Sequence, residues 1–220
     1  SKDRIRQDLD AFVLAQLESL GWQMAPEAST ETLARRLSQG LTGLPISWDR
    51  LIQLRDSENP EALGDYVEEL LASEAFGERW ARWWLDLARY SDSNGLDENL
   101  AYGEAWRFRD YVIRSFNQDK PYDRFLTEQL AGDLLPQPDS DESWRDQRTA
   151  TAFLALGPKM LAEQDKDKLA IDVVDEQLDV AGQTFLGMTI GCARCHDHKF
   201  DPVTARDYYA MAGIFRSTST

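Results

Sequence analysis

The residues best suited to chemistry form one short run, Cys192-Ala-Arg-Cys-His196. Two thiols three positions apart lie on one face of a helix, where each can add to a vinyl group of a haem, and the histidine that follows can ligate the iron. We therefore expect one covalent haem c, tethered by Cys192 and Cys195 and ligated on its proximal side by His196. The chain has no other cysteine, so neither thiol is available for a disulfide elsewhere.

Other sites can be built from the same run. Cys192, Cys195, His196 and His198 supply four acceptable zinc ligands, although the adjacent pair Cys195 and His196 would strain a tetrahedral site. A bare Cys-x-x-Cys also occurs in redox disulfides, but no βαβ pattern surrounds this one. A zinc-stabilised interaction module therefore remains an alternative to the haem domain.

Few residues are available as the second axial ligand of the iron. His198 lies two positions from His196, and at about 3.3–3.6 Å per residue the chain cannot pass around a porphyrin edge between them. Three methionines lie outside the stripe that carries the cysteines: Met160, Met211 and Met24. If no methionine ligates, the iron has an open face, which permits ligand binding or peroxide chemistry.

Helical periodicity runs through nearly the whole sequence, and alternating strand-like runs are absent. We expect a single all-α, multi-helical domain over residues 1–220, with a first helix from about Asp3 to Leu20. The most aromatic helix follows Ser73, and we expect it at the centre of the core because its apolar residues recur at helical spacing: Phe76, Trp80, Trp83, Trp84 and Leu87.

The haem-attachment run is predicted to end a long helix in the C-terminal region. From Ile171 to Cys195, apolar residues recur every three or four positions, so both cysteines would continue its buried stripe. The polar, turn-rich segment from Ser91 to Gly103 has the size of a loop that covers a site.

The charge and the apolar content of the sequence limit the classes of partner that we expect. The formal charge of −15 disfavours nucleic acid and anionic lipid, and no apolar stretch is long enough for membrane insertion of this segment. Haem is joined to Cys-x-x-Cys-His outside the cytoplasm, so we expect an extracytoplasmic protein, periplasmic or exported, whose signal sequence lies outside this segment.

Several longer runs resemble the planctomycete cytochrome-associated domain family of unknown function. The resemblance spans nearly the whole chain. It rests on these matches: Gly191–Pro202 (GCARCHDHKFDP), Leu41–Pro45, Gly77–Trp80, Trp84–Tyr90, Lys120–Phe125, Gln129–Asp133 and Leu156–Pro158.

The resemblance implies a segment of a large exported protein that also carries a cytochrome c domain and is often associated with polysaccharide use. Other redox domains or cytochromes are then the expected partners, with carbohydrate as a further candidate. Among polar residues near the matched runs, Arg89 and Lys199 are candidates for neutralising haem propionates, and His198 for hydrogen bonding to one. Surface charge pairing is the alternative for the two cations.

Three functions follow. The first is electron transfer by one haem c within a larger redox protein. The second is a haem enzyme whose open iron face acts on peroxide, oxygen or a carbohydrate-derived substrate beneath the Ser91–Gly103 loop. The third is the zinc-stabilised or carbohydrate-binding module, in which tryptophans form sugar platforms.

Overall fold

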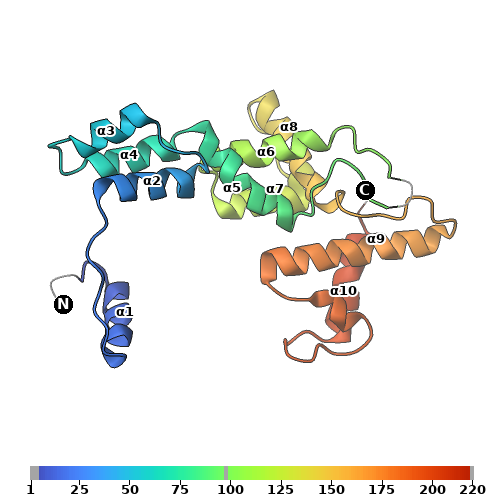
Figure 1. The fold of residues 1–220 in the computed structure, drawn as a ribbon. Helices are drawn as coiled ribbons and strands as arrows, with labels where there is room; N and C mark the ends of the chain where they lie inside the picture. Colours follow the sequence, from blue (N-terminus) through green and yellow to red (C-terminus); the bar gives the residue numbers. More distant parts are fainter. Residues whose placement is uncertain (1–4, 97–98, 219–220) are drawn as a thin grey trace. The chain divides into compact units, whose positions relative to one another are not determined.

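The computed structural model describes residues 5–96 and 99–218, and within these ranges it confirms the all-α prediction. The only bridge between extended segments there joins Ser93 and Ala101. The helices, shown in Figure 1, are α1 (Asp8–Ser19), α2 (Thr30–Leu41), α3 (Trp48–Arg55), α4 (Ala62–Leu71), α5 (Glu74–Leu87), α6 (Ala105–Asn117), α7 (Tyr122–Ala131), α8 (Asp141–Ala150), α9 (Lys166–Ala181) and α10 (Ala205–Arg216).

Contacts divide the chain into two compact units, one of residues 1–39 and 45–67 and one of 40–44 and 68–220. The expectation of one domain over residues 1–220 remains a prediction. In the first unit α1 begins at Asp8, and the predicted start at Asp3 lies outside the described residues. Within α1, Leu14 is buried, whereas Leu9 and Phe12 are exposed.

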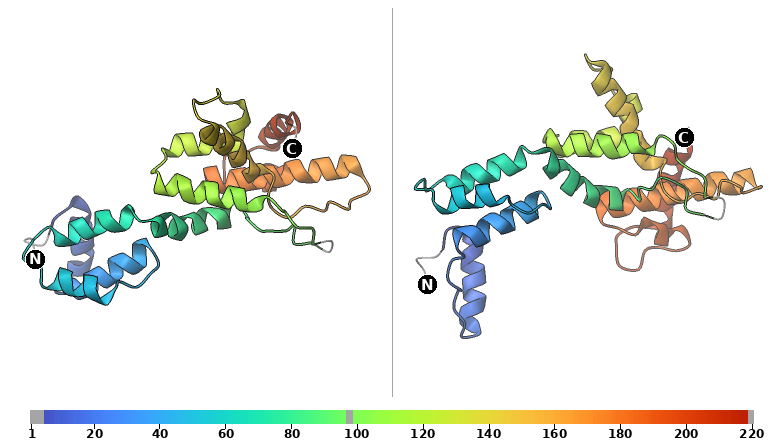
Figure 2. Two further views of the ribbon diagram at one scale, coloured as in Figure 1. Left: turned by 90° about the horizontal axis from the view of Figure 1, so that it is seen from above. Right: turned by 45° about the horizontal axis from the view of Figure 1, so that its top comes forward.

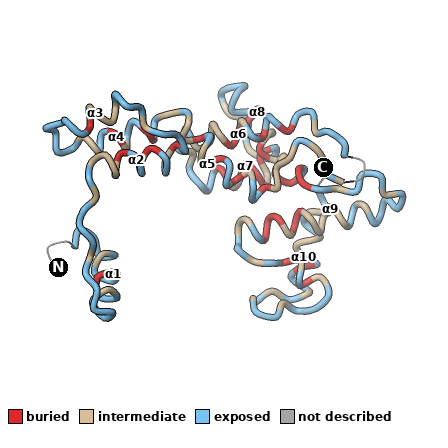
Figure 3. Tube along the Cα trace, in the orientation of Figure 1, coloured by how far each residue is buried: buried red, intermediate tan, exposed pale blue. Residues whose placement is uncertain are grey.

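The second unit has its main core where α5 packs against α6 and α7, visible as buried segments in Figure 3. Our prediction for α5 was partly wrong, since Trp84 is buried but Trp80 and Trp83 are exposed. The buried stripe consists instead of Gly77, Ala81, Trp84 and Ala88. Small residues allow α6 to approach closely: a Cβ at Gly77 would lie 2.5 Å from the side chain of Asn117.

The long helix predicted through Cys195 is interrupted. Helix α9 ends at Ala181, one wide turn follows as η4 (Gly182–Leu186), and Gly187 adopts the left-handed conformation with φ 64°. A glycine in this conformation is the usual end of a helix, because other residues meet a steric penalty there. The chain restarts as the 3₁₀ helix η5 (Ile190–Arg194), so the cysteines do not continue the stripe of α9.

The last helix, α10, is capped by Thr204, whose side chain accepts from the backbone N–H of Asp207, and it packs across α9 (Figure 1). The Ser91–Gly103 segment lies beside the segment that precedes α9 (Figure 2), and Asn94 Nδ2 donates to the carbonyl of Lys159 at 3.1 Å. No helix in the described part of the chain has the length and apolar character needed to cross a membrane.

Candidate functional site

The Cys192–His196 run is presented on a short turn rather than on a buried helical face. Within η5, Ile190 and Ala193 point into a small core with Leu178 and Tyr208, while Cys192 is exposed. Cys195, just after η5, is exposed as well, and both cysteines are free thiols. The prediction that both cysteines are buried is therefore wrong, and the break at Gly187 explains why.

The imidazole of His196 is held in one tautomer. Its Nδ1 lies 2.8 Å from the carbonyl oxygen of Asp197, and because a carbonyl only accepts, Nδ1 must carry the proton. In the neutral imidazole, the lone pair is then on Nε2. The residue is exposed and no partner occupies Nε2 within the described residues. A backbone carbonyl on one nitrogen is the usual arrangement for a histidine whose other nitrogen binds a metal.

Three contacts fix the turn against its neighbours. Arg194 Nη1 pairs with Asp175 Oδ2 of α9 at 2.6 Å, and the hydroxyl of Tyr209 on α10 donates to the carbonyl of Arg194 at 3.1 Å. Gly191 lies so close to α9 that an added Cβ would approach Asp179 Oδ1 to 3.2 Å. Sequence reasoning missed Asp175, because spacing does not indicate which of the acidic residues of α9 faces the turn.

His198 closes the segment that carries the run. Its Nδ1 accepts the backbone N–H groups of Asp201 at 2.8 Å and Phe200 at 3.2 Å, so its proton is on Nε2, which donates to Thr189 Oγ1 at 3.0 Å. The side chain is only 8% exposed. His198 thus ties the loop after the run to Thr189, the residue at the start of η5, and both its nitrogens are engaged.

Arg89 lies in a partly buried ion cluster. Its Nη1 is 2.5 Å from Glu176 Oε1, and Lys159 Nζ is 3.4 Å from Oε2 of the same carboxylate. Burial raises the pKa of Glu176 despite the two cations, and burial lowers the pKa of Lys159 despite the carboxylate. Arg89 therefore forms an ion pair with Glu176, and such charge pairing is the alternative to propionate binding for this residue. Its role toward a propionate remains a prediction.

The other predicted residues occupy varied surroundings. Lys199 Nζ lies 4.9 Å from the ring centroid of Phe200. Met211 is partly buried in α10, against the core that contains Ala193, and Met160 is half-exposed in the segment before α9. The choice between Met160 and Met211 as distal ligand remains a prediction.

Exposed apolar side chains stand before and after the run in the sequence. Leu186 is 55% exposed and Phe200 is 82% exposed. Exposed apolar side chains of this kind are available to contact a flat apolar group. Within the described ranges, no three His, Cys, Asp or Glu side chains approach closely enough to hold a metal ion.

Comparison with known families gives one result. The sequence model of the PSCyt2 family, described as a protein of unknown function (DUF1549), matches residues 8–220, and the chain belongs to that family. Neither the curated proteins nor the solved structures contain a match.

Proposed function

We propose that this member of the PSCyt2 family carries one covalent haem c and transfers electrons within a larger extracytoplasmic redox protein. Cys192 and Cys195 would form the two thioether bonds, each thiol adding across one vinyl group, and His196 would be the proximal ligand. When bound, the group supplies a one-electron iron couple.

The state of His196 is the observation that carries the proposal. Nδ1–H donates to the Asp197 carbonyl, which leaves an exposed Nε2 lone pair four residues after one free thiol and directly after the other. His198, two residues later, differs because both of its nitrogens form hydrogen bonds within the protein. We therefore propose His196 as the iron ligand, and His198 as the residue whose hydrogen bonds hold the loop in place.

The turn itself is suited to hold a ligated iron in place. Arg194 and Tyr209 fix η5 to α9 and α10, so the thiols and the imidazole keep their spacing without a long helix beneath them. A rigid ligand set limits reorganisation when the iron changes oxidation state, which favours electron transfer. The acidic surface then favours neutral or basic redox partners.

The test is a pyridine haemochrome spectrum after acid–acetone extraction, on protein exported by a host competent in cytochrome c maturation. We expect stoichiometric haem that stays with the protein. The double change Cys192→Ser and Cys195→Ser should abolish covalent haem. The matched control, His198→Gln, should retain covalent haem, because it alters the hydrogen bonds of the loop and leaves both thioether-forming cysteines in place. Haem that survives the double cysteine change, or a colourless protein with stoichiometric zinc, would overturn the proposal.

A further inference from the structure

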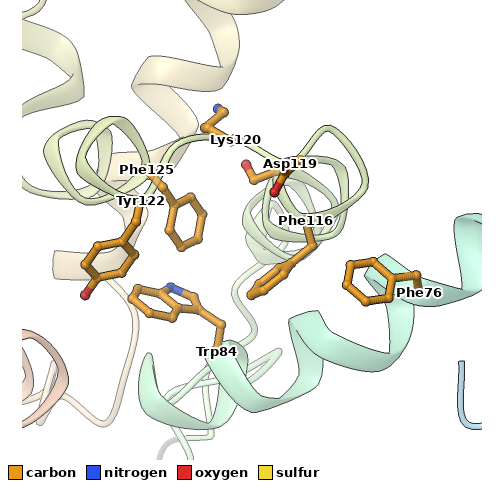
Figure 4. A pocket seen from close by; sticks show the side chains of 8 residues that line it. Phe76, Trp84, Phe116, Asp119, Lys120, Tyr122 and Phe125 are labelled. Atoms are coloured by element: carbon orange, nitrogen blue, oxygen red, sulfur yellow. The ribbon is translucent and has the colours of Figure 1, made fainter. Parts of the chain in front are cut away.

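The second unit contains an aromatic pocket unrelated to the cysteines. It has a volume of about 340 Å³, within the range of small-ligand sites, and lies where α5, α6 and the start of α7 meet (Figure 4). Five of its eight lining residues are aromatic: Phe76, Trp84, Phe116, Tyr122 and Phe125. Trp84 and Phe125 are buried, whereas Tyr122 is 58% exposed at the mouth.

The rings stand at steep angles to one another. Trp84 makes an interplanar angle of 81° with Tyr122 and 59° with Phe125, and Phe116 makes 66° with Phe125. These rings pack on one another at centroid distances of 4.8–6.4 Å, and together they line the pocket in several orientations. Each ring face carries partial negative charge, so such a cage attracts a cation.

The polar groups inside the pocket are already used. Trp84 Nε1 donates to Gln129 Oε1 at 2.7 Å, and Ser115 Oγ donates to the carbonyl of Tyr111 at 2.8 Å. A ligand rich in hydroxyls, such as a sugar, would therefore find few partners in the interior of the pocket. An apolar or diffusely charged group does not need such hydrogen-bond partners.

Asp119 places a carboxylate at the pocket. It follows α6 with φ 47°, and its N–H bonds to the carbonyl of Phe116 at 3.1 Å while that of Lys120 bonds to Ser115 at 3.0 Å. This is a Schellman ending, in which glycine is preferred at the left-handed position. The chain has an aspartate there, and no described residue pairs with its carboxylate.

Asp119 differs from two other charged residues, Arg89 and Lys120. Arg89 occupies the same left-handed position after α5, with φ 54°, and its charge is paired with Glu176. Asp119 has no such partner. The other charge at the pocket, Lys120, is neutralised elsewhere, because its Nζ lies 2.6 Å from Glu128 and 4.6 Å from the centroid of the Tyr111 ring.

We infer that this pocket binds an organic cation, a substituted ammonium group held by the ring faces with Asp119 as its counter-ion. The carboxylate of Asp119, exposed at the edge of the pocket, and the aromatic lining are separate observations that point to the same ligand class. The net charge of −15 raises the local concentration of such cations.

The test is a calorimetric titration with choline chloride against its neutral isostere 3,3-dimethyl-1-butanol, at constant ionic strength. We expect choline to bind with a millimolar dissociation constant and the isostere to bind about tenfold more weakly, since it lacks the charge. A trimethyl-lysine peptide titrated in parallel distinguishes a modified protein side chain from a free small cation as the source.

Variants locate the binding. Asp119→Asn keeps a residue that tolerates the left-handed conformation and should weaken choline about three- to tenfold, and Tyr122→Leu should do the same by removing an exposed ring face. The matched control is Asp123→Asn, an exposed carboxylate on α7 that does not line the pocket and should leave affinity unchanged. Equal binding of the neutral isostere, equal effects at 119 and 123, or absence of saturable choline binding would overturn the inference.

Discussion

Replacing Asp119 with glycine should stabilise the protein. The residue has φ 47° at the end of α6, where a side chain costs about 1 kcal/mol relative to glycine. Its negative charge also lies at the negative end of the helix dipole, which costs about 0.3 kcal/mol at an exposed position. Glycine also gives the unfolded chain more conformational freedom, which offsets about 0.4–1 kcal/mol of the stabilisation. The net expectation is a gain of about 0.5 kcal/mol.

The alanine variant makes the test sharper. Asp119→Ala retains Cβ and loses the tolerance of aspartate for this conformation, so we expect it to be less stable than Asp119→Gly by about 1–2 kcal/mol. Asp119→Asn isolates the charge, because asparagine accepts the same φ. Urea unfolding followed by circular dichroism and by tryptophan fluorescence gives the free energy of unfolding for each variant, with coincident curves as the criterion for one transition.

The reasoning fails if Asp119→Gly is no more stable than Asp119→Ala. In that case the left-handed position imposes no steric cost, and the argument that the aspartate is retained for its charge is lost. If glycine is stabilising but choline affinity is unchanged, the local strain is real and unrelated to binding. Gain of stability together with loss of affinity is the expected result.

Further predictions concern the core and the iron. Glu128→Gln should cost about 3 kcal/mol at neutral pH because it breaks a buried pair with Lys120. Burial raises the pKa of Glu128, but hydrogen bonds from Lys120, Arg124 and Tyr111 outweigh burial and lower this pKa below its usual value. The wild-type protein should therefore lose stability as the pH falls below about 4.5, and the Glu128→Gln variant should show a shallower decline. Gly132→Ala should destabilise the protein by about 3 kcal/mol, since its Cβ would overlap the Gln147 carbonyl. Gly40→Ala in α2, with open space around it, should stabilise the protein by about 0.5–1 kcal/mol. Thermal unfolding of the two variants gives both changes in stability. The ferric haem protein should be low-spin with a methionine–sulfur band that either Met160→Leu or Met211→Leu removes, whereas a high-spin spectrum that shifts with cyanide would instead support a haem enzyme.

Local features of the sequence determined much of this protein. The residue types and spacing of Cys192, Cys195 and His196 predict haem attachment without reference to a fold, and this remains a prediction. Helix starts are local features too, because the side chains of Ser47 and Thr204 accept from the backbone N–H groups three residues later. The all-α class followed from periodicity, which depends on backbone geometry alone.

Only the tertiary structure decided which side of each helix is covered. Periodicity placed large apolar residues of α5 in the core, but α6 packs against its small residues, and Trp80 and Trp83 remain exposed. The apolar repeat across residues 171–195 continued through Gly187, whose left-handed backbone ends the helical path and turns the thiols outward. The pocket near Asp119 joins residues of three helices, and the partner that a charge meets or lacks depends on distances that no spacing along the chain encodes.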